Sequence, residues 1–250
     1  MSADGDLDEQ VVAVVGGPAG MARECAEQLR RRGAIVSSGA TLDDSLRGID
    51  RPSAIVVAPA VPDGSGSAGS THLVGIGAAI GDAVRTVSGA LEVLRTQGCG
   101  RLVLVGPGPA FPVPRHPGLM AFGGALYGLV RSLGADTANG HVVVNGVAPL
   151  VDAPPMTRFF DEHPQVDRRR FRLDGVLPLV AYLVDERCTS RGEIFSAGGG
   201  RVARVGDVTA AGAFVLPGDD AVAASIDRIR SLDAWLEPRG IFDELLLVEV

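Results

Sequence analysis

VVAVVGGPAGMA, residues 11–22, is the stretch that decides the fold of this 250-residue chain. Its first part, VVAVVGG (11–17), is a continuous apolar run closed by glycines, which is typical of a strand buried on both faces of a parallel sheet. AGMARECAEQLRRRG (19–33) follows, and it predicts a helix because apolar residues recur at helical spacing and Gly33 ends the run. A strand that passes through a glycine turn into a helix is the first unit of an α/β fold.

The rest of the chain alternates strands and helices in the same way. Runs of Val, Ile and Ala predict strands, and longer Ala-, Gly- and Leu-rich stretches predict helices. The alternation predicts a doubly wound parallel sheet of the Rossmann type in a single domain, which the last strand closes. Further strands are predicted at 34–38, 53–60, 101–106, 141–149 and 192–200, and further helices at 72–97, 119–138 and 176–186.

Three segments make up the predicted organisation. They are a flexible N-terminus (1–9), a Rossmann-like domain (10–205) and a C-terminal extension (206–250). The extension ends in IFDELLLV (241–248), and each of its large apolar side chains would gain roughly 1.5–3 kcal/mol from burial. We therefore expect the extension to dock, either on its own domain or on a neighbouring subunit.

Composition excludes several classes of partner. The net charge is −7 and all 23 basic residues are Arg, which disfavours nucleic acid and anionic membranes as partners. No apolar run approaches the ~20 residues of a membrane helix, and the acidic N-terminus does not resemble a signal peptide. Cys25, Cys99 and Cys188 lie far apart without metal-ligand spacing. These features favour a cytoplasmic protein with free thiols and no metal.

The first glycine turn carries a resemblance to a known family. Gly16, Gly17, Gly20 and Ala22 lie in a turn that resembles the TGxxxGxG loop of the short-chain dehydrogenases/reductases (SDRs). In that family the loop offers backbone N–H groups to the pyrophosphate of NAD(P). Ala22 stands where the family has its last glycine, and tight packing alone explains such a loop equally well.

The adenosine half of a cofactor site is not expected. NAD selectivity requires an acidic residue after the second strand and NADP a basic one, whereas this chain has Ser37 and Ser38. Residues 37–52 have room for one short helix, so one βα unit is shortened between the second and fourth strands of the family. Residues 57–60, VAPA, replace the family's NNAG. We therefore expect no NAD in this subunit.

The family's catalytic positions hold other residues. RSLGAD (131–136) and VNGVAP (144–149) resemble the helix and strand that set the family's frame. On this frame the Ser position falls on Gly106 or Pro107, the Tyr position on Leu119 and the Lys position on Gly123. The resemblance therefore implies that the catalytic residues are missing from this chain.

Other residues do not restore the chemistry. A slip of one residue gives Met120 and Gly124 at the Tyr and Lys positions. The reaction requires a phenol whose pKa is lowered by an ammonium group, and the chain has no Lys. Tyr127 faces about a turn and a half away from the expected position. His116 is the remaining candidate acid, although a lone His in a proline-rich loop is more often a surface residue.

The C-terminal third resembles a narrower group. Residues 171–205, with VLPLVAYLV, Cys188, GEIF and GGGRV, resemble the 3-hydroxyacyl-CoA dehydrogenase domains of multifunctional β-oxidation enzymes. The resemblance implies tetramers in which the helices equivalent to 72–97 and 119–138 pack against a neighbouring subunit. Packing inside one subunit is the alternative. The small residues that would allow close approach are Gly75, Gly77, Ala78, Ala79, Gly81, Gly89, Gly123, Gly124, Ala125 and Gly128.

These resemblances imply a non-catalytic structural subunit of a hetero-oligomer, such as a heterotetramer. Its active SDR partner would bind NAD and oxidise a 3-hydroxyacyl-CoA. The pairing resembles the heteromeric dehydrogenase of anaerobic toluene degradation, which oxidises 2-(hydroxy(phenyl)methyl)succinyl-CoA in the β-oxidation of benzylsuccinate. Two other hypotheses are a free-standing acyl-CoA or nucleotide binding protein with a vestigial cleft, and an enzyme with relocated catalysis through His116.

Overall fold

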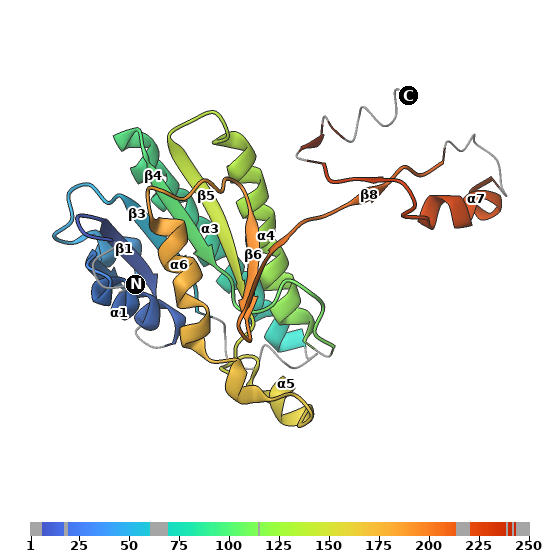
Figure 1. Ribbon diagram of the computed structural model, residues 1–250, viewed down its shortest axis with the longest axis horizontal. Coiled ribbons are helices and arrows are strands. Elements are labelled where there is room, and N and C mark those ends of the chain that lie inside the picture. The colour runs from blue at the N-terminus through green and yellow to red at the C-terminus, as the bar shows by residue number, and fades with distance from the viewer. Residues whose placement is uncertain are drawn as a thin grey trace. The chain divides into compact units, whose positions relative to one another are not determined.

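A computed structural model describes residues 7–17, 20–60, 70–114, 116–213, 221–238, 240, 241 and 243. The chain divides into two compact units, Met1–Val205 and Gly206–Val250. Helices cover both faces of the sheet in the first unit (Figure 1). Its elements are β1 (Val11–Gly16), α1 (Met21–Arg31), β2 (Ile35–Gly39), α2 (Leu42–Leu46), β3 (Ala54–Ala58), α3 (Ser70–Gln97), β4 (Gly100–Val105), α4 (Pro117–Asp136), β5 (Val142–Pro149), α5 (Thr157–Glu162), the 3-10 turns η1 (Arg168–Arg170) and η2 (Leu173–Gly175), α6 (Leu177–Val184), β6 (Ile194–Gly198) and β7 (Arg201–Val205).

The sheet has the predicted doubly wound topology. Its strand order is β2-β1-β3-β4-β5-β6-β7, and neighbouring strands are parallel except for β6 and β7. From β2 at the edge, the chain returns through the short α2 and pairs β3 with the other side of β1. The predicted α/β fold and its shortened βα unit are both confirmed.

The handedness of the connections decides which helices cover which face. The chain moves from β1 to β2 in one direction and from β2 to β3 in the other, so right-handed connections place α1 and α2 on opposite faces. Leu42 and Leu46 of α2 accordingly pack in the same apolar layer as α3 and α4. The helices α1 and α6 lie on the other face (Figure 1). Their apolar side chains belong to the layer on that face.

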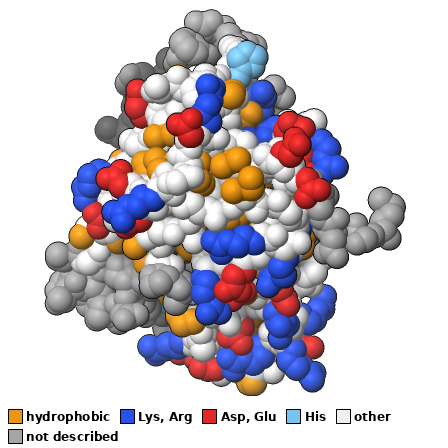
Figure 2. Space-filling model, turned by 90° about the vertical axis from the view of Figure 1, so that its left-hand side faces the viewer, with side chains coloured by type: hydrophobic (Ala, Val, Ile, Leu, Met, Phe, Trp, Pro, Cys, Tyr) orange, Lys and Arg blue, Asp and Glu red, His pale blue; other side chains and the backbone are white. Residues whose placement is uncertain are grey.

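Burial follows the position of each strand in the sheet. Every residue of β3 and β5 is buried, which agrees with their continuous apolar runs. The edge strands β2 and β7 expose apolar side chains, with Ile35 61% and Val202 53% exposed. On the face drawn in Figure 2, Arg side chains lie next to acidic side chains. Ion pairs such as that between Arg47 and Asp44, at 3.1 Å, join residues close together in the chain.

The prediction that 192–200 closes the sheet is wrong. The strand β6 ends at Gly198, and β7 returns antiparallel to it, with Gly198 opposite Arg201. Gly199 and Gly200 form the turn with φ of 61° and 87°, a conformation that glycine adopts without strain. The alternating RVARV that follows therefore adds one more strand to the sheet.

The second unit contains β8 (Thr209–Ala210), α7 (Ala221–Arg230) and β9 (Trp235–Leu236). None of its residues with a described side chain is buried. Most of the apolar terminus 241–248, for which docking is predicted, lies outside the described residues. At the other end of the chain, residues 1–6 of the predicted flexible N-terminus are also outside them, whereas Leu7 is 1% exposed.

No helix in the described part of the chain is both long enough and apolar enough to cross a membrane.

Candidate functional site

The glycine turn between β1 and α1 is packed tightly. A side chain at Gly16 would collide with the carbonyl of Ala58 and the methyl group of Ala22. Gly20 has a φ of 71°, and no side chain caps the helix that follows it. Packing and backbone conformation thus account for these two glycines, while Gly17 has only the Cβ of Ala60 at 4.0 Å.

The end of β2 uses its polar groups within the chain. The Ser38 hydroxyl accepts a hydrogen bond from the Arg30 guanidinium at 3.2 Å, and the Ser37 hydroxyl donates to the Arg47 carbonyl at 3.3 Å. On α2, the buried Ser45 hydroxyl donates to the carbonyl of Val14 at 2.9 Å. The Arg30 guanidinium also donates to the Val36 carbonyl at 3.2 Å, so it is held against β2.

A tyrosine fills the space next to the predicted Ser position. A Cβ at Gly106 would lie 2.5 Å from the Tyr127 hydroxyl oxygen and 2.9 Å from its ring. The hydroxyl donates a hydrogen bond to the Gly108 carbonyl at 2.6 Å. Burial raises the pKa of the Tyr127 phenol. This phenol is therefore a structural donor and is not poised to exchange a proton at neutral pH.

The same ring packs against the predicted Lys position. A Cβ at Gly123 would lie 3.5 Å from the Tyr127 ring. Tyr127 follows Gly123 by one helical turn, and long helical side chains lean toward the N-terminus of their helix. The ring therefore lies between Gly106 and Gly123. Tyr127 lies further along the helix than the predicted Tyr position at Leu119. Its side chain nevertheless reaches back to the predicted Ser and Lys positions, Gly106 and Gly123.

The predicted Tyr position is closed by apolar contacts. Leu119 is 1% exposed, and its side chain would be 3.4 Å from a Cβ at Gly108. We call the apolar group around it the Leu119 cluster. Its buried members are Val113, Leu119, Met156 and Phe160, and its partly buried members are Met120, Leu150, Phe159, Val166 and Phe171.

The two alternative positions of the frame differ from each other. Met120 packs against the Leu119 cluster. Gly124 is exposed, and nothing lies within 4 Å of a Cβ built there. The described residues therefore bring Gly106 and Gly123 together around the Tyr127 ring, whereas Leu119 packs in a separate apolar cluster and lies next to Gly108.

His116 is buried, so the expectation of a surface histidine is wrong. It is 2% exposed and precedes α4 as its N-cap residue. One ring nitrogen, Nδ1, lies 2.9 Å from the Pro114 carbonyl, and the buried Nε2 has no hydrogen-bond partner among the described residues. The loop folds back on itself here because the His116 N–H donates to the Val113 carbonyl at 3.2 Å.

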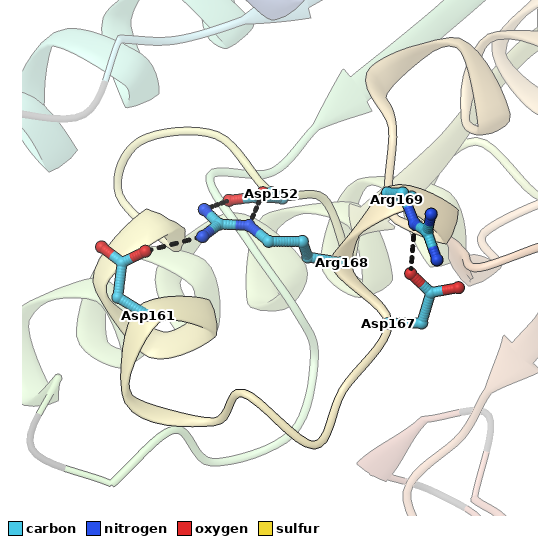
Figure 3. Close-up of polar contacts among 5 residues, drawn as sticks. All are labelled: Asp152, Asp161, Asp167, Arg168 and Arg169. Carbon is cyan, nitrogen blue, oxygen red and sulfur yellow. Dashed lines mark hydrogen bonds and ion pairs between the residues drawn. The ribbon is translucent and has the colours of Figure 1, made fainter.

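The segment after β5 supplies Met156 and Phe160 to the Leu119 cluster, and the sequence analysis does not predict it. Arg168 holds this segment through Asp152 and Asp161 (Figure 3). Hydrogen bonds to these two carboxylates raise the pKa of the Arg168 guanidinium, those to Asp152 most. The four-residue spacing of Met156 and Phe160, which places them on one helix face, was the available signal for α5.

The described groups at this site are of three kinds. A buried phenol that already donates a hydrogen bond lies against Gly106 and Gly123, and apolar side chains surround Leu119. His116, whose buried Nε2 has no partner among the described residues, precedes α4. Among the described residues, no group of three or more His, Cys, Asp or Glu is placed to hold a metal ion.

Comparison with known proteins rests on structure alone. No protein-family model matches the chain, and no curated protein matches its sequence. The full-length peroxisomal multifunctional enzyme type 2 from Drosophila melanogaster is similar, with a TM-score of 0.69 and 19% identity over 97% of this chain and 49% of that chain. A short chain dehydrogenase from Mycobacterium avium has a TM-score of 0.65 and 18% identity over 91% and 97%. A 3-ketoacyl-(acyl-carrier-protein) reductase from Brucella melitensis, complexed with NADH, has a TM-score of 0.65 and 16% identity over 78% and 99%.

These likenesses establish that the chain has the fold of the short-chain dehydrogenases/reductases. The chain spans about half the length of the Drosophila enzyme. The first unit, Met1–Val205, makes up about four fifths of the chain, so a match over 97% includes most of the second unit.

Proposed function

We propose that this chain is a non-catalytic structural subunit of a hetero-oligomeric short-chain dehydrogenase. Its partner is a homologous active subunit that oxidises a 3-hydroxyacyl-CoA with NAD. The observation that carries the proposal is the division of α4 into two sides. One side packs Leu119, Gly123 and Tyr127 where the family's reaction site would be. The other side presents glycines that no contact among the described residues explains.

The exposed glycines of α4 point to an external contact. Nothing lies within 4 Å of a Cβ built at Gly124 or at Gly128. A glycine inside a helix costs about 0.5–1 kcal/mol relative to alanine. Close approach of another helix offsets such a cost because backbones without side chains can pack together. Gly134 differs, because a Cβ there would collide with Gly192 of the same chain.

On α3, internal packing explains one glycine and leaves another unexplained. A Cβ at Gly89 would lie 3.0 Å from the Leu42 side chain, whereas nothing lies within 4 Å of one at Gly77. The two helices pack against each other. Gly77, Gly124 and Gly128 are therefore the positions at which we propose contact with the partner subunit.

The partner's reaction is proposed by likeness to the structural neighbours. These include the Drosophila multifunctional enzyme, the Brucella reductase complexed with NADH, and an enoyl-[acyl-carrier-protein] reductase (NADH) from Aquifex aeolicus. The likeness of residues 171–205 to 3-hydroxyacyl-CoA dehydrogenase domains supports an acyl-CoA substrate. A narrower form of the proposal is oxidation of 2-(hydroxy(phenyl)methyl)succinyl-CoA in toluene degradation.

Co-purification with the product of a neighbouring dehydrogenase gene tests the proposal. We expect a stable complex whose activity is lost when the partner's own catalytic Tyr is replaced. Gly124→Trp is expected to weaken assembly at least tenfold because the indole forces the helices apart. Arg31→Trp on the exposed side of α1 is the matched control and is expected to leave assembly unchanged.

Assays of the isolated chain test whether it has catalytic activity or binds the cofactor without a partner. We expect no oxidation of 3-hydroxyacyl-CoA with NAD or NADP, and no NADH binding by calorimetry at micromolar concentrations. Turnover that His116→Ala abolishes would instead favour relocated catalysis. Micromolar NADH or acyl-CoA affinity without turnover would favour a free-standing binding protein.

A further inference from the structure

The outer side of β2 is an edge of the sheet. β2 stands first in the strand order, and β1 is the strand with which it pairs among the described residues. The chain passes from β2 to β3 through the short α2, so no further strand of the described chain lies beyond β2. The backbone N–H and C=O groups of an edge strand can pair with a strand of another chain. This edge is therefore a surface on which a second sheet can join the first.

Alternate residues of β2 direct their backbone groups to this edge. The Ile35 N–H donates to the Gln10 carbonyl at 2.8 Å, on the side of β1. Successive residues of a strand point their N–H and C=O groups to opposite sides, so Val36 and Ser38 point theirs outward. The side chain of Ile35 is 61% exposed. An exposed apolar side chain beside outward backbone groups favours pairing with another strand.

One arginine covers the outward carbonyl of Val36. Arg30 is exposed and lies in the last turn of α1. Its guanidinium Nη2 donates to the Val36 carbonyl and to the Ser38 hydroxyl, each at 3.2 Å. An approaching strand would have to displace this guanidinium to reach the Val36 carbonyl. Charged side chains at an edge are a common means of preventing edge-to-edge pairing.

A second copy of this chain is the partner that fits this edge and that Arg30 disfavours. Two β2 strands related by a two-fold axis run antiparallel, so their Val36 residues can face each other and exchange two hydrogen bonds. Ile35 would then lie opposite the partner's Ser37, which is smaller. The same symmetry brings the two Arg30 guanidinium groups near the axis, where their like charges repel each other.

We propose that the edge of β2 is a latent self-association surface, and that Arg30 keeps it closed. The inference concerns β2 and not the helices α3 and α4, so it goes beyond the proposed function and holds with or without a partner subunit. In an oligomer built through α3 and α4, a second interface at β2 would link oligomers into open assemblies. Arg30 keeps assembly through the helices closed.

Sedimentation velocity of the full chain, between about 1 and 100 µM, tests the proposal. Arg30→Ala is expected to tighten self-association by about tenfold or more relative to the wild type, because the Val36 carbonyl and the axis are both freed. Arg31→Ala is the matched control. Arg31 is also exposed, lies in the same last turn and bonds within α1, so this variant removes the same charge and should not change association.

A second substitution tests whether the edge itself is responsible. Ile35→Lys in the Arg30→Ala background places a new cation on β2 and should restore the association behaviour of the wild type. Both changes are at exposed side chains, and alanine is a stronger helix former than arginine, so we expect the variants to fold. Arg30→Gln, which also removes the charge, replaces Arg30→Ala if that variant does not fold.

Hydrogen exchange read by mass spectrometry locates the contact. In Arg30→Ala, the amides of residues 34–39 should exchange more slowly at high than at low protein concentration, because the outward N–H groups become hydrogen-bonded. The wild type should show no such difference. Equal self-association of Arg30→Ala and Arg31→Ala would overturn the proposal. Self-association of Arg30→Ala without protection of 34–39, or self-association that Ile35→Lys does not reverse, would overturn it as well.

Discussion

Tyr127 packs against two glycines at the predicted Ser and Lys positions. Its ring lies over Gly106 and Gly123, and its hydroxyl donates to the Gly108 carbonyl. The ring fits only because both glycines lack side chains. A serine at Gly106 would require the ring to move, so these three residues depend on one another. A side chain added at Gly106 would therefore disturb the packing of the Tyr127 ring.

Tyr127→Phe is expected to lower the free energy of unfolding by about 1–3 kcal/mol, because the buried Gly108 carbonyl loses its donor. Denaturation in urea measures the change. Tyr182→Phe is the matched control, since this tyrosine is 43% exposed, and should shift stability by less than about 0.5 kcal/mol. Equal small changes in both variants would mean that the hydroxyl of Tyr127 is not structural.

The three cysteines should differ in reactivity. Cys99 is exposed, whereas Cys25 and Cys188 are buried. Burial raises the pKa of the Cys25 thiol to about 12, and the thiolate is the reactive form. In the native protein at neutral pH, iodoacetamide should modify Cys99 rapidly and the other two only after unfolding. Peptide mapping by mass spectrometry checks this, and rapid labelling of Cys25 would contradict the burial of α1.

Asp185 should contribute to acid sensitivity. It is 6% exposed, and hydrogen bonds from Arg187 hold the pKa of its carboxyl below the ordinary value. A folded-state pKa below the unfolded one gives stability that is complete above the unfolded pKa, about 3.9, and is lost as the pH falls through the folded pKa. Asp185→Asn should therefore be less stable than the wild type at pH 7, and this difference should shrink below about pH 4. Urea midpoints across this range measure it; a constant difference would refute the linkage.

The glycines of α4 have two kinds of surroundings. A Cβ at Gly134 would collide with Gly192 of the loop before β6, whereas no described atom lies within 4 Å of one at Gly128. Sequence spacing alone groups these positions together, since each lies on the same Gly- and Ala-rich helix.

Alanine substitutions distinguish the glycine with a close neighbour, Gly134, from the one without, Gly128. In the isolated chain, Gly128→Ala should raise the free energy of unfolding by about 0.5–1 kcal/mol, because the helix gains propensity without a clash. Gly134→Ala should lower it by about 1–3 kcal/mol, because its Cβ collides with the Gly192 backbone. Thermal denaturation of both variants measures the effects. Destabilisation by Gly128→Ala in the monomer would show an internal contact there and remove support for the proposed interface.

The molecule as a whole consists of a layered first unit and a second unit of different character. All the buried apolar residues of the described chain lie before Gly198. In the second unit, Val222, Leu232 and Trp235 are 57%, 57% and 60% exposed. An isolated helix of ten residues and a ribbon of two short strands are marginal in water. The described elements of the second unit are therefore not expected to fold on their own.

A chain that ends at Val205 is expected to fold alone. Its melting temperature should lie within about 2 °C of the full chain, since a change of that size is less than about 1 kcal/mol for a domain of this length. A peptide of residues 206–250 should show little helix by circular dichroism. A melting temperature lower by more than about 5 °C would mean that the second unit is part of the core of the first.

Local patterns made the layered fold predictable. Each signal for this fold is short: the apolar runs of β1, β3 and β5 and the glycine turn at Gly16 each span only a few residues. Right-handed connections between the strands then restrict the topology. The missing βα unit was also visible, because 37–52 has too few residues for it. The strand β7 was missed because two glycines with positive φ reverse the chain there. His116 was wrongly placed at the surface because its burial depends on neighbours that spacing does not reveal.

The order of apolar runs, glycine turns and helices in the sequence was enough to establish a doubly wound α/β sheet, because each of these signals depends on residues close together in the chain. The side-chain contacts of the candidate site could not be predicted from such local signals. The Tyr127 hydroxyl meets a carbonyl 19 residues away, and Arg168 meets a carboxylate 16 residues away. Whether a glycine faces a ring, a backbone or open solvent depends on such distant contacts, and these exist only once the chain has folded.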